Sequence, residues 1–206
     1  MQLVSNSFED GAAIPSQYAF GKHHPSDNVE LSDNLNPHLH WLDAPEETKS
    51  FVLLCVDTDV PTVGDDVNQA GKTVPVDLPR GEFYHWVMVD IPAAVSSVAE
   101  GSCSDGISAG GKQSPTGPGR QGINDYTSWF AGDPDMAGDY YGYDGPCPPW
   151  NDERVHHYHF KLFATDLDSC AVDGAFTGSD VLAAIEGHIL AEAELVGSYH
   201  IYPNAK

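Results

Sequence analysis

The sequence predicts a mainly β fold, an all-β sandwich with a peripheral C-terminal helix. Three observations predict this class: several segments have the composition or alternation of strands, their connections are rich in glycine and proline, and only one segment has helical spacing. The chain has 206 residues, of which 41% are hydrophobic. This length is typical of one domain, here residues 1–206, and this composition is sufficient for a buried core.

Three segments are expected to form the central strands. Residues 51–57 (FVLLCVD) are apolar on both faces, as in a strand that is covered on both sides. Residues 84–91 (YHWVMVDI) are rich in aromatic and β-branched residues, and strict alternation places His85 on the same face as Val87. Residues 155–165 (VHHYHFKLFAT) alternate cleanly, and their expected core face consists of His156, Tyr158, Phe160, Leu162 and Ala164.

Residues 101–145 are crowded with glycine, proline, serine and aspartate, and we expect them to be mostly loop. A loop of this length usually shapes a functional site. Within it, residues 106–110 match the G-x-S-x-G pattern of serine hydrolases, and residues 106–112 match part of a phosphate-binding loop. Neither match has the flanking strand and helix that its chemistry requires. Both interpretations are rejected in favour of a surface loop.

One segment, residues 179–195, has the periodicity of a helix. Its apolar residues recur at helical spacing, at Val181, Leu182, Ile185, Ile189 and Leu190. Thr177 and Asp180 have the spacing of a capping box, and Gly197 follows the expected end of the helix. A short strand over residues 199–202 is expected after it.

The charge balance argues against two classes of function. Nine Lys and Arg residues against 31 Asp and Glu residues give a formal net charge of −22, so the chain lacks the basic surface that nucleic acids or anionic membranes require. The longest apolar run, residues 51–56, is too short to span a bilayer, and residues 1–15 do not resemble a signal peptide, so a cytoplasmic location is expected. The four cysteines include no C-x-x-C pair, and no metal or cofactor is expected.

Three pieces of the sequence carry groups that could act together. Residues 57–61 (DTDVP) place two carboxylates at the end of a buried strand, and His85 precedes Trp86 on the next predicted strand. Residues 144–149 (DGPCPP) form a rigid turn before the strand that contains His156 and Tyr158. Each piece alone is typical of a structural role, such as a capping Asp, a hydrogen-bonded core His or a buried Tyr.

In this order, the three pieces resemble the phosphatidylethanolamine-binding protein family, also called Raf kinase inhibitor-like proteins, in its bacterial branch. The family pattern D-P-D-A-P is similar to residues 57–61, and the H-W pair is similar to residues 85–86. The G-P-x-P-P turn and the following H-R-Y are similar to residues 145–149 and 156–158. Thr58, Val60 and His157 depart from the family pattern.

The resemblance implies a two-sheet antiparallel β-sandwich of Greek-key type, with a small anion-accepting pocket at one end. Carried over by motif, the ligand-binding residues are Asp57, His85, His156 and Tyr158, rimmed by Val60, Pro61, Cys147 and Pro148. Two imidazoles and a phenol can donate hydrogen bonds to phosphate oxygens, and the carboxylate can fix an imidazole tautomer or meet an ammonium head group. Phe83, Tyr84 and Trp86 are expected to supply an apolar wall or rings that face a cation. We expect weak anion binding that strengthens as the pH falls through the histidine range.

The leading hypothesis is a non-catalytic protein that binds a phosphate or a phosphorylated head group. The resemblance implies that such a protein regulates or inhibits a kinase or a protease. The alternative is a hydrolase of small substrates in which Asp57 and His85 form an acid/base pair, although the sequence shows no credible nucleophile. A third hypothesis assigns the function to an oligomer surface, for example that of a homodimer.

Overall fold

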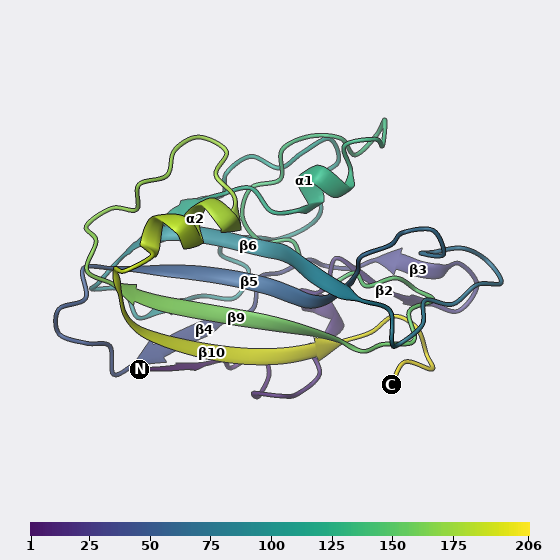
Figure 1. Cartoon of the computed structure of the whole chain (residues 1–206), viewed down its shortest axis with the longest axis horizontal. Helices are drawn as coiled ribbons and strands as arrows, with labels where there is room; N and C mark the ends of the chain where they lie inside the picture. The colour runs from purple at the N-terminus through teal and green to yellow at the C-terminus, as the bar shows by residue number, and fades with distance from the viewer.

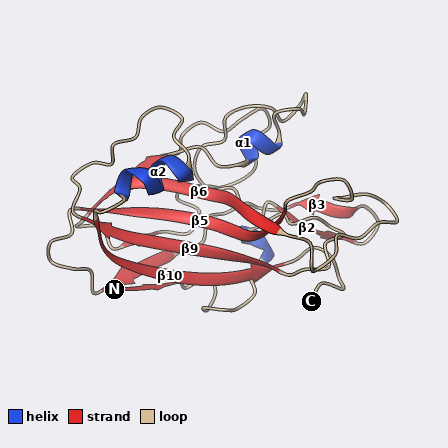
Figure 2. Cartoon of the chain, viewed as in Figure 1, coloured by secondary structure: helices blue, strands red, loops and turns tan.

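The computed structural model describes the whole chain, Met1–Lys206. The predicted class is confirmed: two antiparallel sheets face each other, and helices are few and short (Figures 1 and 2). The larger sheet has the strand order β10 (Ile189–Tyr199), β9 (His156–Thr165), β5 (Ser50–Pro61), β6 (Arg80–Pro92) and β8 (Arg120–Gln121). The smaller sheet consists of β1 (Gln2–Val4), β4 (Leu39–Leu42) and β7 (Ser97–Val98).

The remaining elements lie outside these two sheets. A two-stranded ribbon is formed by β2 (Gly21–His24) and β3 (Asn28–Leu31), and Figure 1 shows it at the end of the molecule opposite to the N-terminus. The helices are η1 (Ser16–Tyr18), α1 (Tyr126–Trp129) and α2 (Gly178–Ile185). All three are too short to cross a bilayer.

The central strand β5 is buried on both faces, as its sequence predicts. Leu53 and Cys55 pack in the core between the two sheets. Val52 and Leu54 point the opposite way, into a second core that α2 covers. An apolar residue at every position is therefore required, because both sides of this strand face protein.

The register of β5 brings the ends of three strands together. Asp57 on β5 lies opposite Phe83 on β6 and opposite Tyr158 on β9. One of the three register shifts between β5 and β6 lies where Cys55 pairs with Trp86 and Val56 pairs with Tyr84.

His85 is therefore the extra residue of a β-bulge. Such a bulge turns the side chain at the irregular position. As a result, His85 does not share a face with Val87, as strict alternation predicted: Val87 packs in the core under α2, whereas His85 contacts Tyr158 on the other side of the sheet. The prediction for this face was wrong because the pattern contains no sign of the bulge.

The predicted helix over residues 179–195 is correct only in its first half. Thr177 and Asp180 form the expected capping box at its beginning. The helix ends at Ile185, and Gly187 then adopts a left-handed φ of +79°, which glycine adopts without strain.

The second half of that segment is strand β10, which pairs along the whole of β9. This pairing satisfies the backbone groups at the edge of β9, which a helix would leave open. Gly197 is therefore not a helix cap: it lies in β10, where a Cβ would come within 2.4 Å of the side chain of Ile14. The expected strand over residues 199–202 is likewise wrong beyond Tyr199, where β10 ends.

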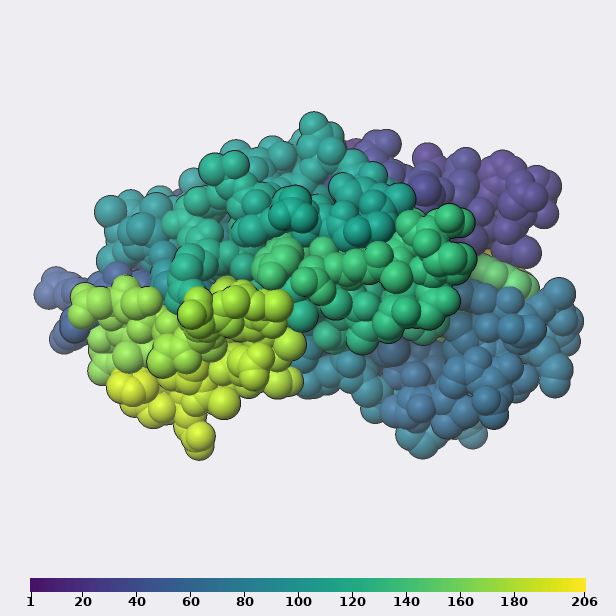
Figure 3. Space-filling model, turned by 90° about the horizontal axis from the view of Figure 1, so that it is seen from above, coloured from purple at the N-terminus to yellow at the C-terminus, as the bar shows by residue number.

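Residues 101–145 are mostly loop, as predicted, and contain only β8 and α1. In the view from above this segment, teal to green, spreads across the molecule between the N-terminal residues and the C-terminal part that includes α2 (Figure 3). It brings α1 to the same end of the sandwich as the ribbon of β2 and β3 (Figure 1).

Leu53 and Leu42 provide a test of where the core lies. Leu53 is completely buried between the sheets, whereas Leu42 on β4 is 46% exposed. We expect Leu53→Ala to lower the free energy of unfolding by about 2–5 kcal/mol through loss of contacts and a residual cavity. The matched variant Leu42→Ala should change it by less than about 0.5 kcal/mol. Urea unfolding measures both values, and equal effects would contradict the assigned core.

Candidate functional site

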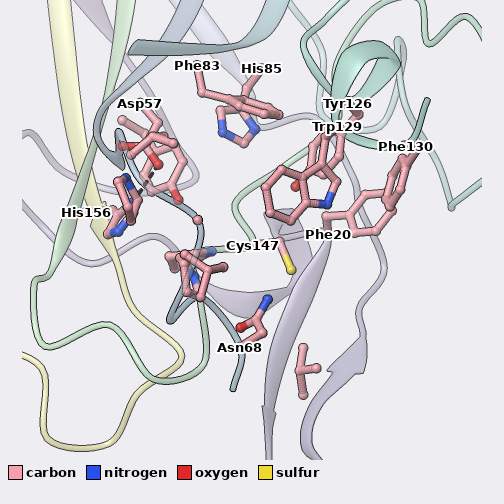
Figure 4. Close-up of a pocket in the computed structure, with 18 of the residues that line it drawn as sticks. Phe20, Asp57, Asn68, Phe83, His85, Tyr126, Trp129, Phe130, Cys147 and His156 are labelled. Atoms are coloured by element: carbon pink, nitrogen blue, oxygen red, sulfur yellow. Dashed lines mark hydrogen bonds and ion pairs between the residues drawn. The ribbon is translucent and has the colours of Figure 1, made fainter. Parts of the chain in front are cut away.

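A cavity of about 250 Å³ opens at the end of the sandwich where β5, β6 and β9 meet α1 and the ribbon. Figure 4 shows Asp57 and His156 on one side of this cavity and the rings of Tyr126, Trp129 and Phe130 on the other. The structure brings every site residue expected from the sequence to the wall of this one cavity: Asp57, Val60, Pro61, His85, Cys147, Pro148, His156 and Tyr158.

A chain of alternating charges lies behind the cavity. The Nδ1 atom of His156 lies 2.7 Å from a carboxylate oxygen of Asp57, and its Nε2 atom lies 3.1 Å from Asp152. Asp152 also accepts two hydrogen bonds from the guanidinium of Arg80, at 2.6 and 3.0 Å. Burial opposes the positive charge of His156, but the two carboxylates outweigh it and raise its pKa to about 9.

His156 is consequently an imidazolium at neutral pH, with both of its N–H groups bound to carboxylates. The expectation that both imidazoles donate to a ligand is therefore corrected: His156 has no free N–H. Its role is to hold Asp57 in place and to neutralise that carboxylate. The alternating chain from Asp57 to Arg80 leaves no uncompensated cation at the cavity.

His85 is the opposite case, because it remains neutral. Its Nδ1 atom lies 2.8 Å from the backbone oxygen of Asp144, and since a carbonyl can only accept, Nδ1 carries the proton. Burial lowers the pKa of His85, and the nearby charge of Asp57 offsets this only in part. The Nε2 atom is therefore a lone-pair acceptor without a protein partner, on a ring that lines the cavity.

The position of Asp144 is fixed by a buried network. Its carboxylate accepts hydrogen bonds from Asn34 at 2.7 Å and Asn124 at 2.8 Å, and pairs with Lys112 at 2.9 Å. Lys112 is the lysine of the rejected phosphate-loop pattern, so its observed role is to anchor the turn that orients His85. Sequence reasoning missed this network, because its members lie far apart along the chain.

Tyr158 carries the polar group of the cavity whose hydrogen bonding is most clearly unsatisfied. Its hydroxyl is fully buried and makes no hydrogen bond of good geometry, although the carboxylate of Asp57 lies near it. Burial and the neighbouring carboxylate of Asp57 raise its pKa well above 10, so the hydroxyl keeps its proton and can donate it. Buried polar groups in native proteins are rarely left in this state.

The apolar wall differs from the one that the sequence predicted. Of the three expected rings, only Phe83 lines the cavity. Trp86 lies in the core, where its indole N–H donates to Gln121 at 2.8 Å, and Tyr84 packs on the opposite face of the sheet. The additional lining rings, which sequence reasoning missed, are Phe20, Tyr126, Trp129 and Phe130.

Cys147 adds an uncharged surface to the lip of the cavity. Burial raises the pKa of its thiol to about 12, so it does not have the thiolate that makes a cysteine reactive. No group of three or more His, Cys, Asp or Glu side chains in this structure is placed to hold a metal ion.

Comparison with known proteins shows which family the chain resembles. A family model described as phosphatidylethanolamine-binding protein matches residues 4–200. A UPF0098 protein of Aquifex aeolicus is 32% identical over 199 residues, which cover 97% of this chain and 88% of that protein. The UPF0098 protein YbhB of Escherichia coli is 29% identical over 202 residues, 97% of this chain and 99% of that protein.

Solved structures of related proteins have a similar fold. Escherichia coli YbcL, described as a member of the mammalian PEBP family, has a TM-score of 0.67 at 28% identity, with 97% of each chain covered. A phosphatidylethanolamine-binding protein homologue of Chlamydia trachomatis has a TM-score of 0.64 at 28% identity, covering 97% of this chain and 96% of that chain. A further relative, 31% identical, comes from Methanothermobacter thermautotrophicus, so the likeness is not restricted to bacterial proteins.

The two buried histidines should differ in charge at pH 7. We expect the ¹⁵N ring signals of His156 to show an imidazolium and those of His85 to show the neutral form with its proton on Nδ1. NMR of selectively labelled protein distinguishes the two states. A neutral His156 at pH 7 would contradict its pairing with the carboxylates of Asp57 and Asp152.

The pairing of His156 with these two carboxylates also predicts how the free energy of unfolding depends on pH. The pKa of His156 is raised from 6.5 to about 9 on folding, so its contribution is fully present below pH 6.5 and is lost as the pH rises through about 9. This corresponds to a decrease of roughly 3 kcal/mol in the free energy of unfolding. Urea unfolding across this range should show the decrease, and Asp152→Asn, which removes one carboxylate, should reduce it and move it to lower pH.

Proposed function

Because the chain belongs to the phosphatidylethanolamine-binding protein family, we propose that it is a non-catalytic binding protein whose pocket accepts a small acidic group, such as phosphate or a phosphorylated head group. The observation that carries this proposal is the hydroxyl of Tyr158, which is buried at the cavity without a partner. An unsatisfied buried donor is destabilising, and an acceptor oxygen of a ligand would satisfy it.

His85 supplies the second contact in this proposal. While it is neutral, its Nε2 atom can accept a hydrogen bond from a protonated acid. When a fully ionised group binds, the added negative charge favours the imidazolium form, and Nε2–H becomes a donor. The charged groups that act on His85 are Asp57, Asp125 and Asp144. Anion binding is therefore coupled to the uptake of one proton.

The arrangement of Asp57 favours binding over hydrolysis. An acid/base pair of Asp57 and His85 requires a hydrogen bond between them or through the substrate. Here Asp57 accepts from the backbone N–H of Asp59 at 2.8 Å and bonds to His156, while His85 bonds to Asp144. The carboxylate of Asp57 and the Nδ1 atom of His85 are thus engaged with other partners, and the two side chains are not hydrogen-bonded to each other. We keep regulation of a kinase or a protease as the downstream role, which the family resemblance implies.

Removal of the Tyr158 hydroxyl separates binding from stability. We expect Tyr158→Phe to weaken the binding of sulfate or phosphoethanolamine by about 10- to 100-fold, the effect of one lost hydrogen bond to a charged group. Its free energy of unfolding should stay equal or rise, because an unsatisfied buried group is removed. Isothermal titration calorimetry and urea unfolding measure the two effects.

Tyr143 provides the matched control for this variant. Its hydroxyl is also buried but donates to the backbone oxygen of Tyr18 at 2.6 Å. Tyr143→Phe should therefore lose about 1–3 kcal/mol of stability and keep its affinity for sulfate. Equal sulfate affinity in Tyr158→Phe and the wild type would remove the basis of the proposal.

The proton coupled to His85 predicts a pH dependence of binding. Sulfate is a suitable probe because its charge is constant over this range. Its affinity should rise as the pH falls, by up to about tenfold per pH unit, until His85 is protonated in the free protein as well. His85→Asn keeps a donor for the oxygen of Asp144 but cannot take up a proton, so its affinity should not vary with pH. A slope that persists in His85→Asn would assign the proton to another group.

A further inference from the structure

The cavity is larger than the acidic group that its polar end can hold. An apolar cavity of about 150 Å³ is sufficient for benzene, whereas this cavity measures about 250 Å³. The polar groups available to an acid at the strand end of the cavity are Tyr158 and His85, and one further amide, that of Asn68, lies elsewhere in the lining. The rest of the volume must be filled by another part of the ligand or by water.

The walls of this remaining volume are aromatic. The rings of Phe20 and Tyr126 are stacked at 4.6 Å between centroids, and those of Tyr126 and Phe130 at 5.5 Å, each pair with an interplanar angle of 19°. Together with Trp129 they form what we call the aromatic wall: Phe20, Tyr126, Trp129 and Phe130. The ring of Tyr126 also meets His85 edge-on at 5.6 Å, so the wall is continuous with the polar end of the cavity.

Two apolar side chains of the cavity remain in contact with solvent. Trp129 is 55% exposed and Leu31 on β3 is 63% exposed, and both line the cavity. The other tryptophans of the chain are less exposed. Exposed apolar side chains gathered at a cavity are typical of a binding site rather than of a scattered surface. A ligand that covered them would remove this apolar area from water.

The charges restrict the ligand further. The cavity lining contains no lysine or arginine, and the aromatic wall carries no charge. The protein as a whole has a net charge of −22, which disfavours any ligand with more than one acidic group. The ligand should therefore carry one acidic group, and the rest of the molecule should be uncharged.

We propose that the ligand is a small aromatic acid or aromatic phosphomonoester, with its acidic group at Tyr158 and His85 and its ring along the aromatic wall. This inference rests on the proposed acid-binding function and adds the chemical class of the ligand. An aromatic ring fits better than a long acyl chain for two reasons. The cavity volume is small, and stacked or edge-to-face contacts with the four rings favour an aromatic partner beyond the area that it buries.

The test compares three phosphomonoesters that share one acidic group, which are methyl, butyl and phenyl phosphate. Titration calorimetry with the whole protein should show phenyl phosphate binding about tenfold or more tightly than methyl phosphate, with butyl phosphate between them. In Trp129→Ala the ratio of phenyl phosphate affinity to methyl phosphate affinity should fall to about threefold or less. Trp129→Phe should keep most of the advantage, because it keeps a ring.

Leu42→Ala is the control, since Leu42 is an exposed apolar residue on β4 outside the cavity. It should bind all three esters as the wild type does. If phenyl and methyl phosphate bind equally, the inference on the ring is overturned while the acid-binding function stands. If butyl phosphate binds most tightly, an alkyl ligand replaces the aromatic one. If none of the three binds, the acid-binding function itself fails, and the inference fails with it.

Discussion

The register of β5 against its two neighbours is the constraint on which the rest of the site depends. It sets Asp57 opposite both Phe83 and Tyr158. Because side chains alternate between faces, a slip of one residue would turn these groups to the side that α2 covers. The bulge at His85 is part of the same register: it adds one residue to β6 and so directs the imidazole towards Tyr158. The polar end of the cavity is thus a property of the sheet, and the loops only complete it.

The charged side chains behind the cavity neutralise one another before any ligand binds. Asp57, His156, Asp152 and Arg80 alternate in sign and bind one another, which makes a rigid support without a free cation. The capacity to hold an acid then depends on neutral groups, the hydroxyl of Tyr158 and the imidazole of His85. In a strongly acidic protein this arrangement selects for a ligand that brings little negative charge or a proton with it. The aromatic wall provides the remaining affinity through apolar contact, which does not depend on charge.

The sequence predictions failed where one pattern is compatible with two structures. Residues 179–195 have helical spacing throughout, yet the segment from Ile189 pairs with β9 because that edge needs hydrogen-bond partners. Strict alternation placed His85 with Val87, but alternation cannot reveal a bulge, which depends on the partner strand. Tyr84 and Trp86, on either side of His85 in the sequence, were expected to contribute rings to the cavity. Their side chains instead enter two different cores.

The sequence by itself determined the fold class, the central strands, the capped start of α2 and the set of polar residues around the cavity. The fold class, the strands and the start of α2 follow from local periodicity and capping chemistry, whereas the polar residues follow from motifs that resemble those of a known family. Only the tertiary structure decided what those residues do. It tied His156 to Asp57, 99 positions away, and oriented His85 through Asp144, 59 positions away. It also brought Phe20 against the rings of Tyr126 in α1 and Phe130 just after it. The reason is physical: hydrogen bonds and ring contacts depend on distances in space, and strand register and loop paths fix these distances between residues that share no local pattern.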